Sequence, residues 1–222
     1  MSRILMLIPT DVERRWADSL IDKLSEKAQV ELCGFGPIVA GIRTAQLIAE
    51  HRPQRVLLLG IAGATDAELQ VGEAYEFDHV ACYGIGVGCG STFQTATEMG
   101  WSHWSSNNSD SNIQSADIQS IGDAIQLSSP DLSSGARARL LLTVCAASAN
   151  AAEVASHRQK FPQAAAEDME GFSVAAACKL ARVSLRILRG ISNRAGDREH
   201  ENWQSAAAMQ AVVQLALATL DD

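Results

Sequence analysis

The sequence predicts an α/β protein with three layers, α/β/α, built around a central mixed, mostly parallel sheet. Short apolar runs such as Ile4–Ile8 and residues 56–59 are typical of buried parallel strands. Segments with apolar residues at helical spacing alternate with these runs, and this alternation favours a sheet covered on both faces. The length of 222 residues suits one domain, so we expect residues 1–222 to fold as a single unit.

The elements follow one another in a regular order. Ile4–Ile8 is the first expected strand, and a helix follows Pro9 because Val12, Trp16, Leu20 and Leu24 recur at helical spacing. The further expected strands are 30–33, 56–59, 75–83, 140–145, 164–167 and 185–191. The further expected helices are 38–50, 150–160, 170–181 and 206–220.

A polar segment lies at about residues 102–134, where Ser, Asn, Asp and Gly dominate and large apolar residues are few. Such a composition cannot bury a core of its own. We therefore expect a Ser-rich surface excursion from the single domain rather than a second domain.

Charge and composition narrow the class of partner. The formal net charge of −8 at pH 7 argues against nucleic acid, because binding phosphates requires clustered Lys and Arg. No apolar stretch reaches the ~18 residues of a membrane span, and the run after Arg3 is shorter than a signal-peptide core. The five cysteines are scattered without a C-x-x-C pair, as is typical of reduced thiols. We expect a cytoplasmic protein that does not bind membranes.

Three carboxylates, Glu167, Asp168 and Glu170, stand at an expected strand-to-helix junction, where open α/β sheets place ligands. Helix capping is one interpretation, and it suits Asp168 well. The other is ribose binding, because a carboxylate can accept both hydroxyl protons of a vicinal diol. Such bonds strengthen as positive charge grows on the sugar, so they favour an oxocarbenium-like transition state.

Ser192 and Asn193 end a second expected strand, with Asp197 a few residues beyond. An Asx-type turn explains them without function. Alternatively, an Asn amide can bond both O6 and N7 of a 6-oxopurine, whereas an Asp would suit a 6-aminopurine better. On this interpretation Asn193 favours hypoxanthine as the base.

Glu13 follows the first expected strand and is either a solvated acid in the first helical turn or a general base. As a base it would take a proton from a water on the face of the sugar opposite the departing base. The five histidines show no pair at ligand spacing, so we expect no metal site.

The glycine-rich stretches do not predict a dinucleotide site. Gly34-Phe35-Gly36-Pro37 is followed by Val39 where G-x-G-x-x-G needs its third glycine, and a G-x-x-x-x-G-K-[ST] segment is also absent from the sequence. This stretch is either a tight turn or a place where the backbone approaches a ligand closely.

Together these stretches resemble the nucleoside phosphorylase and nucleosidase superfamily, and within it the futalosine hydrolases. The resemblance rests on two segments in the last third of the chain and two glycine turns. These are Asp168-Met169-Glu170-Gly171-Phe172, residues 189–198, Gly34-Phe35-Gly36-Pro37 and Gly60-Ile61-Ala62-Gly63.

The resemblance implies an N-ribosyl hydrolase that cleaves futalosine to hypoxanthine and dehypoxanthinylfutalosine in menaquinone biosynthesis. It also implies the three-layer fold, a homodimer or higher homo-oligomer, and no cofactor or metal. The implied roles are catalysis by Glu13, Asn193 and Asp197, ribose binding by Met169 and Glu170, and base binding by Asn193, Ala62 and Gly63.

Other functions stay open at this point. A methylthioadenosine/S-adenosylhomocysteine nucleosidase is one, but adenine-cleaving relatives carry a serine after the first glycine where this chain has Ile61. A purine nucleoside phosphorylase is another, but the early segments lack its phosphate-binding arginines, and Arg43 falls within an expected helix. A non-catalytic nucleoside-binding protein is a third, for which the carboxylate of Glu13 would have no evident use.

Overall fold

A computed structural model describes residues 4–17, 20–105, 120–128 and 137–220. Its centre is an eight-stranded sheet with the order β11-β10-β4-β12-β3-β1-β2, in which β9 also pairs with β4. The strands of this sheet are β1 (Ile4–Ile8), β2 (Gln29–Leu32), β3 (Arg55–Ala64), β4 (Ala74–Tyr83), β9 (Ala124–Gln126), β10 (Arg137–Val144), β11 (Ala164–Asp168) and β12 (Ser184–Arg194).

The sheet is mixed and mostly parallel, and part of it closes on itself. The pairings β1–β2, β1–β3, β3–β12, β4–β10 and β10–β11 are parallel, whereas β12–β4 and β4–β9 are antiparallel. The end of β11 additionally pairs antiparallel with the end of β3, through Glu167 opposite Gly63. This last pairing joins β11, β10, β4, β12 and β3 into a ring.

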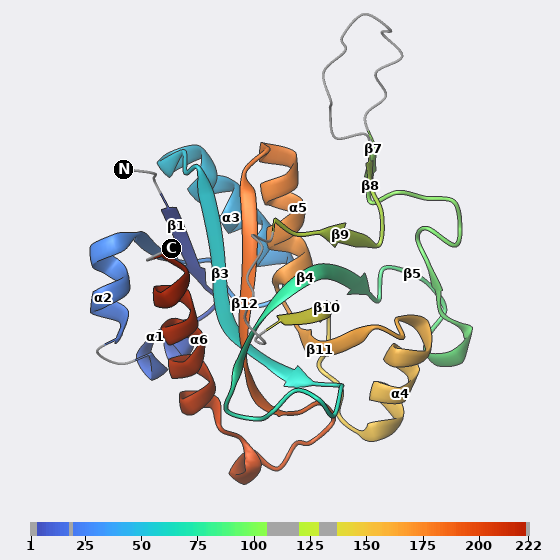
Figure 1. Cartoon of the computed structure of the whole chain (residues 1–222). Coiled ribbons are helices and arrows are strands. Elements are labelled where there is room, and N and C mark those ends of the chain that lie inside the picture. The colour runs from blue at the N-terminus through green and yellow to red at the C-terminus, as the bar shows by residue number, and fades with distance from the viewer. Residues whose placement is uncertain (1–3, 18–19, 106–119, 129–136, 221–222) are drawn as a thin grey trace, which may run out of the picture.

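Helices cover both faces of the sheet (Figure 1). On one face α6 (Ser205–Leu220) packs against β12 and β3, and α1 (Asp11–Trp16) and α2 (Leu20–Lys27) pack against α6. On the other, α5 (Gly171–Ala181) packs against β4, β10 and β12, with α3 (Pro37–His51) against α5. Helix α4 (Ala151–Lys160) connects β10 to β11 along the chain and lies at the β11 edge of the sheet (Figure 1). The short elements are β5 (Gly86–Val87), η1 (Gly90–Thr92), β6 (Gln94–Thr95), β7 (Trp104–Ser105), β8 (Ser120–Ile121) and η2 (His200–Asn202).

Alternation along β1 explains the layers. Leu5 and Leu7 are fully buried in the core beneath α3 and α5, and Met6 and Ile8 are fully buried in the core beneath α6. A strand buried on both faces needs a continuous apolar run, because successive side chains point to opposite faces. The three-layer α/β/α fold expected from the sequence is therefore confirmed.

Several boundaries differ from the expectation. Gly60-Ile61-Ala62-Gly63 was expected as a glycine turn but lies inside β3, because hydrogen bonding to β12 continues to Ala64. Ser192 and Asn193 lie in the last residues of β12, which continues to Arg194. The first expected helix is two helices, α1 and α2.

Most of the expected polar excursion at 102–134 lies outside the described residues. Its described part does not stay on the surface, since Ile121 and Ile125 are buried and β9 joins the main sheet.

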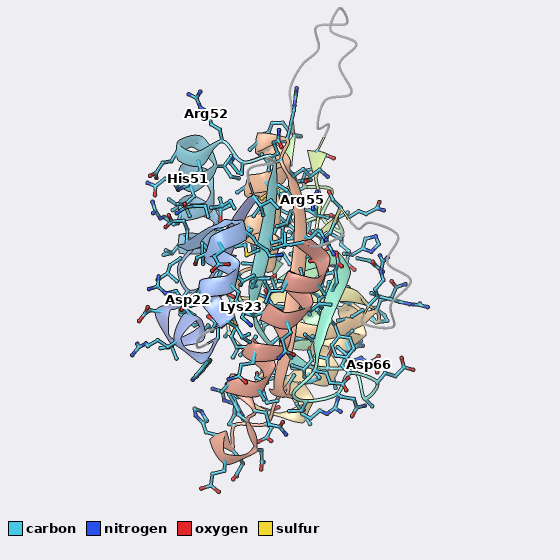
Figure 2. All side chains as sticks on the ribbon, turned by 60° about the vertical axis from the view of Figure 1, so that its left-hand side comes forward. Asp22, Lys23, His51, Arg52, Arg55 and Asp66 are labelled. Atoms are coloured by element: carbon cyan, nitrogen blue, oxygen red, sulfur yellow. The ribbon has the colours of Figure 1, made fainter. Side chains whose placement is uncertain are left out.

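The carboxyl ends of β1, β3 and β12 share one end of the molecule. Arg55 and Asp66, which stand at and just beyond the two ends of β3, mark the opposite ends of the sheet in Figure 2. Among the described helices none has the length and apolar character that crossing a bilayer requires.

Candidate active site

A cavity of about 310 Å³ opens at the carboxyl ends of these strands. Its size is at the lower end of the range for small-molecule sites. The structure brings together in its wall all of the predicted site residues except Asp197. They are Glu13, Ala62, Gly63, Met169, Glu170 and Asn193.

Glu13 is fixed by the start of α1. Thr10 caps this helix and forms a capping box, in which its hydroxyl accepts from the Glu13 amide at 3.2 Å. In return Glu13 Oε2 accepts from the Thr10 amide at 3.1 Å and from its hydroxyl at 2.7 Å. The other oxygen, Oε1, accepts from the Ile61 amide of β3 at 3.1 Å.

Burial raises the pKa of Glu13 above its ordinary value, against the opposing field of the Arg189 guanidinium. A carboxylate with a raised pKa is a stronger base than a solvated one. Glu13 is therefore suited to take a proton from a water in the cavity.

Arg189 lies at the centre of the carboxylates, with no exposed surface. Its Nε donates to Asp168 Oδ2 at 3.1 Å, and its Nη2 donates to the same oxygen and, at 3.5 Å, to Glu170 Oε2. Its Nη1 has no hydrogen-bond partner within the part of the chain that the structure describes. A Cβ atom on Gly60 would overlap this Nη1 and lie 2.9 Å from Glu13 Oε1. The unpartnered nitrogen and the Glu13 carboxylate therefore meet at Gly60.

Asp168 holds this arrangement together. Its Oδ1 accepts from the Thr143 hydroxyl at 2.6 Å, and its Oδ2 accepts from the Gly171 amide at 2.9 Å in addition to Arg189. The N-cap residue of α5 is Glu170 and not Asp168, which was one interpretation of the sequence. Asp168 instead lies two residues before the cap, where it accepts from the first amide of the helix and balances the charge of Arg189.

Glu170 faces the cavity from the start of α5. Its Oε1 accepts from the Gly36 amide at 2.9 Å, and Gly36 has the positive φ of 79° that glycine adopts readily. Burial raises the pKa of Glu170 to about 7, opposed by Arg189 and reinforced by the charge of Asp168. Met169 lines the cavity next to it.

Asn193 is oriented by three hydrogen bonds. Its Nδ2 donates to the Arg194 carbonyl at 2.8 Å and to the Asp197 carbonyl at 3.4 Å, and its Oδ1 accepts from the Ser192 hydroxyl at 2.7 Å. Both amide hydrogens are therefore used by the backbone, while Oδ1 keeps one lone pair. The structure thus offers an acceptor from Asn193, rather than the donor–acceptor pair expected for recognition of O6 and N7.

Asp197 is placed differently from the expectation. Its carboxylate accepts from the Glu199 amide at 2.9 Å and from the Asn202 side chain at 3.0 Å, and Asp197 is not among the described residues that line the cavity. These bonds lower the pKa of Asp197. These contacts anchor the 194–203 loop, and the catalytic role expected of Asp197 stays a prediction.

Sequence reasoning missed two contributors, Arg189 and Gly60. The available signal was the pair Arg186 and Arg189 inside the expected strand 185–191, because a charged residue in a buried strand needs a charged partner. The described residues contain no group of three or more His, Cys, Asp or Glu side chains arranged to hold a metal.

Comparison with known proteins agrees with this geometry. The family model described as the Phosphorylase superfamily matches residues 113–221. A futalosine hydrolase from Streptomyces coelicolor is 28% identical over 184 residues, covering 81% of this chain and 72% of that protein. Over residues 113–221 the chain is similar to the phosphorylase superfamily. A futalosine hydrolase from Acidothermus cellulolyticus is 37% identical over 70 residues, which cover 32% of this chain and 29% of that protein.

Several solved structures share the fold of this chain. The 5′-methylthioadenosine/S-adenosylhomocysteine nucleosidase from Neisseria meningitidis, in complex with methylthio-immucillin-A, has a TM-score of 0.73 at 17% identity over 100% of both chains. The corresponding nucleosidase from Colwellia psychrerythraea, in complex with adenine, has a TM-score of 0.72 at 19% identity, covering 100% of this chain and 96% of that one.

Proposed function

We propose that this chain is an N-ribosyl hydrolase of purine nucleosides and a member of the phosphorylase superfamily. One observation carries the proposal: Glu13 and Arg189 Nη1 meet at Gly60, whereas Asn193 lies beside Gly63, three residues further along β3. Three residues of a strand span about 10 Å. This separation suits a ribosyl group with an attacking water on one side and the departing base on the other.

Glu170 supports the sugar between these two points. Gly36 and Arg189 hold its carboxylate in the cavity wall, and in its ionised form it can accept protons from both hydroxyls of a ribose diol. As the bond to the base breaks, positive charge develops on the sugar, and the negative carboxylate stabilises that charge more than it stabilises the substrate.

The proposed reaction breaks the bond between C1′ and N9. The bonding electrons leave with the base, which takes up a proton from solvent at N7, and Asn193 Oδ1 accepts a hydrogen bond from the resulting N7–H. Water forms the new bond to C1′ and loses a proton to Glu13. Arg189 is fully buried and does not line the cavity, so it acts on this step through its charge, which opposes the burial-driven rise in the pKa of Glu13.

The charge at the water side favours hydrolysis over phosphorolysis. Three carboxylates, Glu13, Asp168 and Glu170, surround the single guanidinium of Arg189. The net negative charge of this group repels a phosphate anion, whereas it does not repel a neutral water molecule. Arg43, which lies in α3, faces a different groove from the cavity.

We propose futalosine as the substrate, with hypoxanthine and dehypoxanthinylfutalosine as products in menaquinone biosynthesis. The relatives named futalosine hydrolase support this choice. The apolar side chains of Met169, Val144 and Trp203 line the cavity and could contact a 5′ substituent. The free thiols fit a reducing cytoplasm as the site of action.

Release of free base from futalosine, inosine and methylthioadenosine, with and without phosphate, tests the proposal chromatographically. Hypoxanthine from futalosine, independent of phosphate, is the expected result. Adenine release from methylthioadenosine would favour a nucleosidase like the structural neighbours, and phosphate-dependent release a phosphorylase. Binding without release of base would favour a non-catalytic binding protein.

We also propose that the chain forms a homodimer through α3 and its surroundings. Phe35, Ile38 and Ile42 are 64%, 75% and 60% exposed on this face, and such a patch is costly to leave in water. Phe35 also lines the cavity, so a second copy would cover the cavity mouth. A monomeric mass by analytical ultracentrifugation would contradict this assembly.

A further inference from the structure

A buried polar cluster forms one end of the cavity, and the mechanism above does not use it. Glu167 Oε1 accepts from the Ser148 amide at 2.8 Å, and Oε2 accepts from the Ser148 hydroxyl at 2.8 Å. His157 Nδ1 of α4 lies 3.4 Å from Oε2 and 3.2 Å from the Ser148 hydroxyl oxygen. Glu167 is only 5% exposed, yet both it and Ser148 line the cavity.

The position of Glu167 follows from closure of the sheet. Gly63 of β3 pairs with Glu167 of β11 on one side and with Asn193 of β12 on the other. Residues paired across neighbouring strands project to the same face of a sheet. The carboxylate and the amide therefore flank Gly63 at a Cα separation of about 10 Å, which is two strand spacings.

A structural role alone does not require a carboxylate at this position. A glutamine could still accept from the Ser148 amide through its carbonyl oxygen, and it would carry no charge to bury. A carboxylate has about four lone-pair sites, so these contacts leave acceptor capacity toward the cavity. Glu167 is thus a buried acceptor, without a proton to donate when ionised, at the end of the cavity that holds Asn193.

The two purine classes differ in what they present to such an acceptor. A 6-oxopurine carries a hydrogen on N1, whereas a 6-aminopurine has an unprotonated N1 that is itself an acceptor. A carboxylate accepts a hydrogen bond from N1–H of the 6-oxopurine and repels the lone pair on N1 of the 6-aminopurine. Because the Nδ2 hydrogens of Asn193 are taken by the backbone, Asn193 has no donor left with which to make this distinction at O6.

We propose that Glu167 is the residue that selects a 6-oxopurine, by accepting a hydrogen bond from N1–H of the base. This inference rests on the proposed function and assigns the base choice of that reaction. A hydrogen bond to a charged group contributes enough to discriminate roughly 10- to 150-fold. In this arrangement Asn193 Oδ1 accepts from N7–H of the departing base, and Glu167 accepts from N1–H on the six-membered ring.

Binding of free bases tests the assignment apart from turnover. Calorimetry on the parent protein is expected to give hypoxanthine a Kd roughly 10- to 150-fold lower than that of adenine. The amide of Gln in Glu167→Gln can donate to N1 of adenine. This variant is expected to bind hypoxanthine more weakly and adenine more tightly than the parent, which reverses or abolishes the preference. Glu167→Ala makes room at N1 and is expected to gain affinity for 1-methylhypoxanthine, which lacks the N1 hydrogen.

Glu153→Gln is the matched control, because Glu153 accepts from the Ala149 amide in the same loop but does not line the cavity. It is expected to keep the parent preference. An unchanged ratio of hypoxanthine to adenine affinity in folded Glu167→Gln would overturn the assignment while leaving the proposed hydrolase intact. A parent protein that neither binds these bases nor releases them from nucleosides would overturn the proposed function, and the assignment with it.

Discussion

The Nη1 nitrogen of Arg189 occupies the space that a side chain on Gly60 would fill. The two residues are register partners in adjacent parallel strands, and the guanidinium crosses over the bare glycine on the side where Glu13 Oε1 also lies. Only a residue without a Cβ atom leaves room for this crossing. Gly60 is thus part of the candidate site although it contributes no side-chain chemistry.

Gly60→Ala is expected to disturb both stability and activity. The added methyl group would displace a fully buried guanidinium, and overpacking of this kind typically costs about 1–3 kcal/mol. Urea unfolding should show a lower free energy of unfolding, and kcat should fall because Arg189 no longer faces Glu13. Gly122→Ala is the control, since a Cβ there meets its nearest neighbour at an ordinary 3.4 Å. Equal behaviour of the two variants would contradict the crossing.

Glu13→Gln is expected to reduce kcat by about 10²–10⁴-fold, the usual contribution of a general base. Glutamine keeps the size of the side chain and can still accept from the Ile61 amide, so the protein should fold. Steady-state hydrolysis of futalosine measures the loss. Asp11→Asn is the matched control, because Asp11 lies on the same helix but is exposed and outside the cavity. Turnover in folded Glu13→Gln that equals that of Asp11→Asn would disprove the assignment.

The value of kcat/KM is expected to fall as the pH drops below about 7. Glu170 must be ionised to accept both ribose hydroxyls, and burial raises its pKa to about 7. The active form therefore predominates above that pH and is lost below it, and the raised pKa of Glu13 acts in the same direction. Measurement of kcat/KM from pH 5 to 9 reports these groups in the free enzyme. A flat profile down to pH 5 would exclude an essential carboxylate with a raised pKa.

Local patterns in the sequence predicted the layers and most of the polar side chains of the candidate site. Apolar runs such as Ile4–Ile8 determine which strands are buried on both faces, and strand ends determine where ligands can bind. Glu13, Glu170 and Asn193 were reached in this way, since each stands in or beside a strand end. Their convergence on one cavity agrees with the expected topology.

Contacts that depend on strand pairing were not accessible to the same reasoning. The antiparallel return of β11 onto β3 places Glu167 beside Gly63, and periodicity contains no information about which strand end pairs with which. The same pairing network extends β3 through Gly63, where the glycines had suggested a turn. The rotation of the Asn193 amide is similarly set by carbonyl groups of a loop that folds back on it.

Glu170 also imposes a cost on folding, which gives a last prediction. Its pKa is about 7 in the folded protein against an ordinary value of 4.5, so the folded state binds the proton more tightly than the unfolded state. Its favourable contribution to the free energy of unfolding is therefore complete below about pH 4.5 and is lost as the pH rises through 7.

At pH 8 the parent protein holds a buried charge that Glu170→Gln does not have. Urea unfolding should find Glu170→Gln more stable than the parent at pH 8, with the difference shrinking toward pH 5, and slower in hydrolysis at both values. A stability difference that does not change with pH would show that the pKa of Glu170 is the same in the folded and unfolded states. Burial in the cavity wall would then not raise this pKa.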